Sequence, residues 1–234
     1  FENLTGSGFN DVLTGTTGAN TIDGGAGDDV IDSGAGATIA DTLIGGIGTD
    51  TLLYTSATAG VTMNLSLTTA QTTGGAGSDT ISGFENLTGS GFNDVLTGTT
   101  GANTIDGAGG NDSIQGGAGD DILIGNAGTD TVTYAAAATA VTVNLALTTA
   151  QDTLGAGIDT LATFENLTGS GFNDTLTGDT GSNSIDGGAG NDTIQGGDGN
   201  DTLIGNAGTD TVSYAAAATA VTVNLALTTA QDTL

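Results

Sequence analysis

The chain of 234 residues contains no lysine, arginine, histidine, cysteine or proline, whereas 27 acidic residues give it a formal net charge of −27. Phosphate contacts that anchor nucleic acids are made largely by Lys and Arg, so nucleic acids and anionic membranes are not expected as partners. Cations are favoured instead. The lack of cysteine excludes a disulfide scaffold. No apolar run approaches the roughly 18 residues of a membrane-spanning helix, so no membrane insertion is expected.

Groups that perform catalysis are equally scarce. Without His, Lys, Arg or Cys, only carboxylates remain for general acid–base chemistry, and nothing interrupts the repeats to build a unique cleft. The sequence therefore predicts that the protein is not an enzyme. A catalytic carboxylate pair of the glycosidase type is a weaker alternative for the same reason. An ice-binding face of outward threonines is also a weaker alternative, because adjacent coils do not hold an unbroken row of threonines.

The chain consists of long, nearly identical repeats. FENLTGSGFND occurs at Phe1, Phe84 and Phe164 and defines units 1–83, 84–163 and 164–234, the last of them shorter. Residues 84–154 and 164–234 align without gaps and differ at 11 positions. Such likeness is typical of a tandem array. Because the chain has no initiator Met and both its ends match internal junctions, we expect it to be an excerpt of one longer, continuous solenoid.

A shorter period of nine residues runs inside each unit. In unit two, an aliphatic residue occupies every ninth position: Leu87, Leu96, Ile105, Ile114, Leu123 and Val132. Nine does not fit the 3.6-residue helical period, and glycine-rich sequence is unfavourable in helices. Short strands that point one aliphatic side chain inward, separated by glycine turns, fit better. The predicted fold is all-β, a parallel β-solenoid in which each nonamer forms half a coil.

The nonamers carry the pattern GGxGxDx-aliphatic-x, which resembles the RTX (repeats-in-toxin) nonapeptide of the calcium-binding parallel β-roll. Examples are GGAGDDVID at 24–32, GGAGDDILI at 116–124, GGAGNDTIQ at 187–195 and GGDGNDTLI at 196–204. The resemblance implies a β-roll that binds several calcium ions (Ca²⁺), about three per unit of roughly 80 residues. Calcium takes six to eight oxygen ligands from carboxylates and backbone carbonyls, and glycines let those carbonyls converge.

The resemblance assigns the metal ligands to the sixth position of each nonamer. Residues 18 apart stack on neighbouring coils, where a cation between two carboxylates would offset their repulsion. The implied pairs are Asp94–Asp112, Asp112–Asp130, Asn103–Asp121, Asp174–Asp192, Asp192–Asp210, Asn183–Asp201, Asp11–Asp29, Asp29–Asp50 and Asn20–Asp41. The last two pairs are 21 residues apart, because unit one carries a three-residue insertion near residues 37–39. Asparagine is expected to weaken the sites at Asn20, Asn103 and Asn183. Phenylalanine replaces glycine at Phe9, Phe92 and Phe172, so those loops could be distorted or metal-free. Asp79 and Asp159 stand in looser copies, and their ligation is left open.

The remainder of each unit departs from the nonamer. VTVNLAL at 141–147 alternates, which predicts an extra strand with Val141, Val143, Leu145 and Leu147 on one face. Tyr134 follows Val132 by two positions and is expected on the inner face. The intervening AAAATA fits a surface turn, or a contact between neighbouring molecules. Glu2, Glu85 and Glu165 recur once per unit in FENL, and a structural role is expected for them.

Two functions fit these features. The tandem array favours a calcium-dependent extracellular structural protein, such as a surface-layer protein, fibre or adhesin stalk that assembles with copies of itself. The alternative is the calcium-binding secretion and folding module of an RTX toxin or hydrolase. The resemblance implies type I secretion of an unfolded chain from a Gram-negative cell and folding in external calcium, and a chain without cysteine suits that route.

Overall fold

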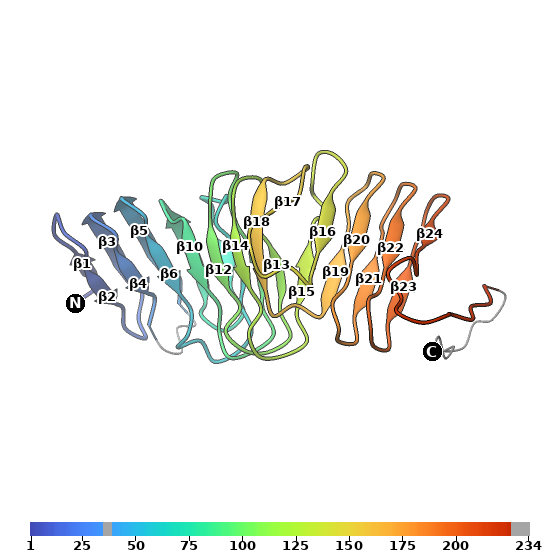
Figure 1. The fold of residues 1–234 in the computed structure, drawn as a ribbon. Helices are drawn as coiled ribbons and strands as arrows, with labels where there is room; N and C mark the ends of the chain where they lie inside the picture. Colours follow the sequence, from blue (N-terminus) through green and yellow to red (C-terminus); the bar gives the residue numbers. More distant parts are fainter. Residues whose placement is uncertain (35–38, 226–234) are drawn as a thin grey trace.

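The computed structural model describes residues 1–34 and 39–225. They form a row of flat coils stacked along one axis, with β1 (Asn3–Thr5) and β24 (Thr211–Val212) at opposite ends of the row (Figure 1). All regular elements among these residues are strands, and most pair in parallel. The all-β, parallel solenoid expected from the sequence is confirmed, with sheets that do not close on one another. None of the described residues forms a helix long and apolar enough to span a membrane.

The strands fall into four sheets. The first holds β1 (Asn3–Thr5), β3 (Thr21–Ala26), β5 (Thr42–Ile47), β9 (Ser78–Ser82) and β8 (Gln71–Thr72). The second holds β2 (Val12–Thr14), β4 (Val30–Asp32), β6 (Thr51–Leu53), β10 (Asn86–Thr88), β12 (Thr104–Asp106), β14 (Ile122–Ile124), β18 (Ile158–Ala162) and β17 (Gln151–Asp152). The third holds β7 (Thr62–Asn64), β11 (Val95–Thr97), β13 (Ser113–Gln115), β15 (Thr131–Thr133), β19 (Asn166–Thr168), β21 (Ser184–Asp186) and β23 (Thr202–Ile204). The fourth holds β16 (Thr142–Asn144), β20 (Thr175–Thr177), β22 (Thr193–Gln195) and β24 (Thr211–Val212).

The nine-residue period sets both the register and the core. Leu87 pairs with Ile105 and Ile105 with Leu123, so equivalent aliphatic residues stack directly along the axis. These inward side chains are almost completely buried, as is Tyr134 on the same inner face. Their neighbours in each strand point outward, as the alternation of a strand requires. Each nonamer is therefore half a coil.

The turns depend on glycine at two positions of the nonamer. In the loop before β14, Gly117 and Gly119 have φ angles of 110° and 115°, which side chains other than glycine rarely adopt. A β-carbon on Gly117 would also lie 1.9 Å from the Thr99 carbonyl oxygen of the preceding coil. Coils can stack this closely only because the side chain is missing.

The segment between nonamer blocks interlocks consecutive units. After β6 the chain moves forward to form β7, on which β11 of the next unit stacks. It then returns through β8, which is antiparallel to β9, while β9 stacks on β5. The side-chain amide of Gln71 completes the sheet between β8 and β7. It accepts from the Asn64 N–H at 2.8 Å and donates to the Asn64 carbonyl at 2.8 Å. Gln151 makes the same contacts with Asn144.

The interlock also rotates each unit by a half-turn about the axis. In unit one the FENL strand β1 belongs to the sheet of β3 and β5. In unit two the FENL strand β10 stacks instead on β6, which belongs to the opposite sheet. In unit three β19 stacks on β15 and so changes sheet again. Equivalent features therefore alternate between the two sides of the row.

The predicted extra strand forms, but it is shorter than expected. Val141, Val143 and Leu145 are buried, whereas Leu147 is 42% exposed, so placing Leu147 on the inner face was wrong. The strand β16 stops at Asn144, whose side-chain oxygen accepts the Ala146 N–H at 2.9 Å and turns the chain outward. The unit-one insertion near residues 37–39 lies mostly outside the described residues.

Candidate metal sites

The residues at the sixth position of the nonamers form hydrogen-bonded ladders along the axis. The Asp94 N–H donates to Oδ1 of Asp112 at 2.9 Å, and the Asp112 N–H donates to Oδ1 of Asp130 at 2.8 Å. All the pairs expected from the sequence are brought together in this way, the others being Asn103–Asp121, Asp174–Asp192, Asp192–Asp210, Asn183–Asp201, Asp11–Asp29, Asp29–Asp50 and Asn20–Asp41. Each contact fixes one carboxylate oxygen and leaves the second for another partner.

In one group of loops, the open loops, that second oxygen is buried and has no hydrogen-bond partner. This holds for Oδ2 of Asp29, Asp41, Asp50, Asp112, Asp121, Asp130 and Asp192. A buried acceptor left unpaired costs about 1–3 kcal/mol, and more if it is charged. Nearly all buried polar groups in proteins are paired, so seven orphaned oxygens of one kind indicate a partner of another chemical type.

The surroundings of these oxygens suit a hard cation. A β-carbon on Gly107 would lie 2.3 Å from Oδ2 of Asp112 and 3.0 Å from the carbonyl oxygen of Gly125 on the next coil. A carboxylate oxygen and a backbone carbonyl thus border the space that the missing side chain leaves. Gly24 borders Asp29 and the Gly45 carbonyl in the same way, as does Gly187 with Asp192 and the Gly205 carbonyl. Carboxylates and carbonyls are the ligands that Ca²⁺ prefers.

A second group, the closed loops, satisfies its own side chains. Oδ2 of Asp94 accepts the Ser90 N–H at 2.6 Å, and Oδ1 accepts the Ser90 hydroxyl and the Val61 N–H, both at 2.7 Å. Asp174 repeats these contacts with Ser170 and Val141. Oδ2 of Asp11 accepts the Ser7 N–H. The asparagine loops close similarly, since the side-chain oxygens of Asn20, Asn103 and Asn183 accept the backbone N–H four residues earlier.

Asp201 and Asp210 belong to the last nonamers of the described chain. Both are half-buried rather than buried, and each Oδ2 lies beside the first glycine of its own loop, Gly196 or Gly205, as in the open loops. All 15 predicted ligand positions are therefore in the ladders. Three or more acidic side chains do not converge anywhere in the described chain, so each site would combine one or two carboxylates with carbonyls.

Burial raises the pKa of Asp112 and Asp121 in the absence of a cation. Desolvation, with a smaller contribution from Asp159 and Asp120, raises the pKa of Asp121 to about 7. Desolvation also raises the pKa of Asp112 to about 6, and the negative charges of Asp94 and Asp130 add to that rise. A divalent cation beside these groups would favour the charged form and reverse these shifts.

Sequence reasoning missed three features of the ladders: an exposed ladder at the fifth position, the tyrosine contacts of Asp79 and Asp159, and the part played by the FENL glutamates. At the fifth position, Oδ1 of Asn93 accepts the Asn111 N–H at 2.9 Å, which forms a second, exposed ladder. At each junction, Asp79 and Asp159 hydrogen-bond a buried tyrosine hydroxyl, for Asp159 that of Tyr134 at 3.0 Å. The recurrence of asparagine at the fifth position was a usable signal. The tyrosine contact spans 25 residues and left no local pattern.

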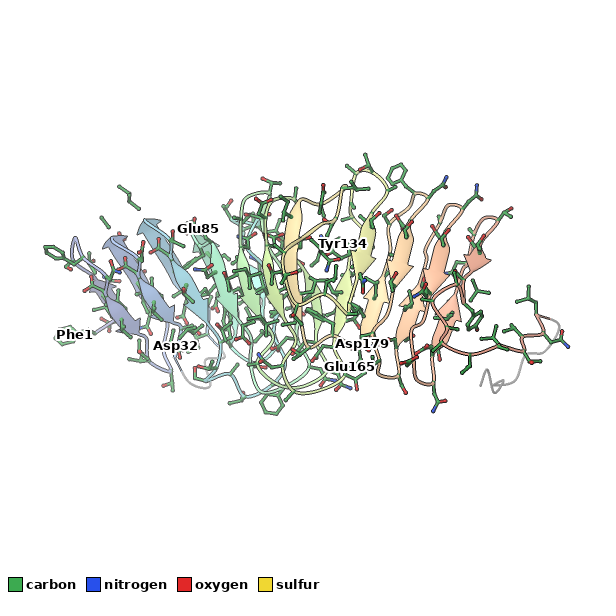
Figure 2. All side chains as sticks on the ribbon, in the orientation of Figure 1. Phe1, Asp32, Glu85, Tyr134, Glu165 and Asp179 are labelled. Carbon is green, nitrogen blue, oxygen red and sulfur yellow. The ribbon has the colours of Figure 1, made fainter. Side chains whose placement is uncertain are left out.

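The glutamates of FENL also belong to the ladder. Oε2 of Glu85 accepts the Asp50 N–H at 2.9 Å, and Oε2 of Glu165 accepts the Asp130 N–H at 2.8 Å. Figure 2 shows Glu85 towards the upper edge of the row of coils and Glu165 towards the lower edge, as the half-turn between units requires. This contact could not be predicted from the sequence, because each unit has a single glutamate and its separation in sequence from the aspartate it contacts does not follow the nine-residue period.

The fold and its ladders define a parallel β-roll with cation-binding loops. The profile of one family, described as the RTX calcium-binding nonapeptide repeat (4 copies), matches residues 5–39, 40–54, 73–86, 88–114, 97–132, 168–203 and 186–216. These segments cover more than half of the chain, so the chain belongs to this family and consists of calcium-binding repeats. Comparison with curated proteins finds no match.

Proposed function

We propose that this protein is an extracellular structural element, a rod that calcium folds and stiffens and that assembles with copies of itself into a fibre or surface lattice. The observation that carries the proposal is the set of seven buried, unpartnered carboxylate oxygens in axial ladders. Each would hold a cation between two coils, so the ions would join neighbouring coils wherever an open loop lies between them. The ligands would come from the open loops and from the carbonyls beside them.

Calcium would supply the charge compensation that the chain lacks. The protein has 27 acidic side chains and no basic ones, and its core receives about one aliphatic side chain per nonamer. Ordering a glycine-rich backbone has a large entropic cost, and like charges repel one another in a compact state. Calcium-dependent folding suits secretion by the type I route of Gram-negative cells, because the chain would stay unfolded inside the cell and fold in the abundant calcium outside it.

The interlock supports a rod rather than a chain of independent modules. The sheets run through the unit boundary, because two strands of unit two pair with strands of unit one. Strand β11 stacks on β7, and β10 stacks on β6. Solenoid repeats of this kind contact only their neighbours and extend in one dimension. A role in mechanical support needs no catalytic group, so we propose no enzymatic activity.

Apolar side chains on the closed loops support lateral association. Phe9, Phe92 and Phe172 are 80%, 47% and 45% exposed, one in each unit. Because successive units are turned by half a revolution, these side chains face opposite sides of the rod. Exposed aromatic side chains at regular intervals favour contacts between neighbouring copies.

The experiment is small-angle scattering and electron microscopy of the chain in calcium and in EDTA. The proposal predicts rods in calcium that associate with increasing concentration, and expanded coils in EDTA. The triple variant Phe9→Ser, Phe92→Ser and Phe172→Ser should leave the rod intact and abolish association. A monomeric rod at every concentration would contradict the assembly and favour the alternative, a calcium-dependent secretion module.

A further inference from the structure

The unit boundary contains a shortened copy of the nonamer loop. In a regular nonamer, the sixth-position aspartate stands five positions after the first glycine, as Asp112 does after Gly107. At the boundary, Glu85 stands only two positions after Gly83, and Glu165 stands two positions after Thr163. Gly83 and Thr163 both have positive φ angles, 70° and 59°, which make this tighter turn.

Each glutamate makes the contact that the sixth-position aspartate makes elsewhere. Oε2 of Glu85 accepts the Asp50 N–H at 2.9 Å, the same distance at which Oδ1 of Asp112 accepts the Asp94 N–H. Glu165 repeats the contact with Asp130 at 2.8 Å. The glutamate side chain has one more methylene group, which compensates for the shorter loop. A carboxylate is therefore kept in the ladder where the nonamer pattern is interrupted.

A second observation at the same place points to a ligand. Oδ2 of Asp50 and Oδ2 of Asp130 are buried without a hydrogen-bond partner, and both residues have an exposed fraction of 0%. A β-carbon on Gly45 would lie 2.8 Å from Oδ2 of Asp50 and 1.9 Å from the Gly83 carbonyl oxygen. A β-carbon on Gly125 would lie 2.7 Å from Oδ2 of Asp130 and 2.4 Å from the Thr163 carbonyl oxygen. This is the arrangement around Gly107 in the open loops.

We propose that Glu85 and Glu165 complete a divalent-cation site at each unit boundary. Asp50, the Gly83 carbonyl and Glu85 supply the oxygens of one site, and the equivalent residues around Asp130 supply those of the other. The inference rests on the proposed function, because the cation is the calcium that fills the open loops. Its consequence is that the line of bound ions continues through the interlock, so that calcium also fastens one unit to the next.

The chain provides a matched control for this proposal. Glu2 stands in the same FENL sequence, but it is exposed, and within the described residues its carboxylate does not accept an aspartate N–H as those of Glu85 and Glu165 do. The variants are Glu85→Gln, Glu165→Gln, their double variant and Glu2→Gln. Glutamine keeps an oxygen that can accept the Asp50 or Asp130 N–H and removes only the charge. Glu85→Ala and Glu165→Ala remove the acceptor as well.

The experiment measures bound calcium by equilibrium dialysis at saturating calcium, together with the calcium concentration at the folding midpoint. Each single Glu→Gln variant should lose one ion, the double variant two, and both should need more calcium to fold, while Glu2→Gln matches the wild type. Glutamine variants that match the wild type while alanine variants fail would overturn the proposal, because the glutamate would then serve only as a hydrogen-bond acceptor. A wild-type chain that binds no calcium would instead refute the proposed function itself.

Discussion

Replacing Asp112 by asparagine should change stability in opposite directions with and without calcium. Asparagine keeps an oxygen for the Asp94 N–H, a contact of 2.9 Å in the structure. It removes the charge from Oδ2, which is buried and unpartnered. Without calcium that charge is a cost, because burial raises the pKa of Asp112 to about 6. With calcium the same charge is a ligand.

The magnitude follows from the pKa shift. One pKa unit corresponds to 1.36 kcal/mol, so the rise from an ordinary carboxyl value is equivalent to at most about 3 kcal/mol, which solvent screening reduces to roughly 1–2 kcal/mol. In EDTA at pH 8, Asp112→Asn should therefore stabilise the folded state by roughly 1–2 kcal/mol. In calcium the variant should bind fewer ions and unfold at a lower temperature.

The assay is circular dichroism in two buffers. In EDTA, trimethylamine N-oxide can drive folding because it is excluded from the protein surface, and its midpoint reports relative stability. Asp94→Asn is the matched control, since both oxygens of Asp94 already accept protein donors. It should destabilise the protein in both buffers and leave the bound calcium unchanged. Asp112→Asn that destabilises in EDTA as well would refute the reasoning.

Three further predictions concern the ladder and the junction. In EDTA, the chain should fold more readily at pH 5 than at pH 8, because the folded-state pKa values of Asp121 (about 7) and Asp112 (about 6) exceed the unfolded value. The folded state therefore gains stability as the pH falls through that window, and the opposite trend by circular dichroism would contradict the prediction. Tyr134→Phe should cost about 1–2 kcal/mol in thermal unfolding without altering bound calcium, because it removes the donor 3.0 Å from Asp159. A lost ion would contradict a purely structural role for this contact. Gln151→Ala should speed hydrogen exchange at the Asn144 N–H, its partner at 2.8 Å, and unchanged exchange would argue against the amide bridge.

The sequence predicted the regular part of the fold because that part depends on local periodicity. Leu87, Ile105 and Leu123 recur at a fixed spacing, and their stacking follows once each nonamer is half a coil. The ladder pairs follow from the same spacing. The interlock could not be predicted, because β7 pairs with a strand 33 residues later through an irregular segment. The interlock is stabilised by the side-chain amide of Gln71, which takes the place of a backbone peptide group beside Asn64. No sequence pattern marks that role.

The distinction between open and closed loops was also only partly visible in the sequence. Phenylalanine in the closed loops marked them as unusual. However, their closure depends on Ser90, whose hydroxyl and N–H reach Asp94, and a serine among glycines is not distinctive. The role of Glu85 depends on a turn shorter than the nonamer. Such features arise from the coil geometry and become visible only when neighbouring coils are placed together.

The measurement that tests the central claim most directly is a calcium titration of the EDTA-treated chain followed by circular dichroism. The ladders predict a disordered spectrum in EDTA that becomes β cooperatively at about 0.1–1 mM calcium, the range of extracellular calcium modules. Magnesium should substitute poorly, because it demands octahedral geometry and retains its waters. A β spectrum that persists unchanged after exhaustive dialysis against EDTA would contradict the claim that calcium holds the coils together.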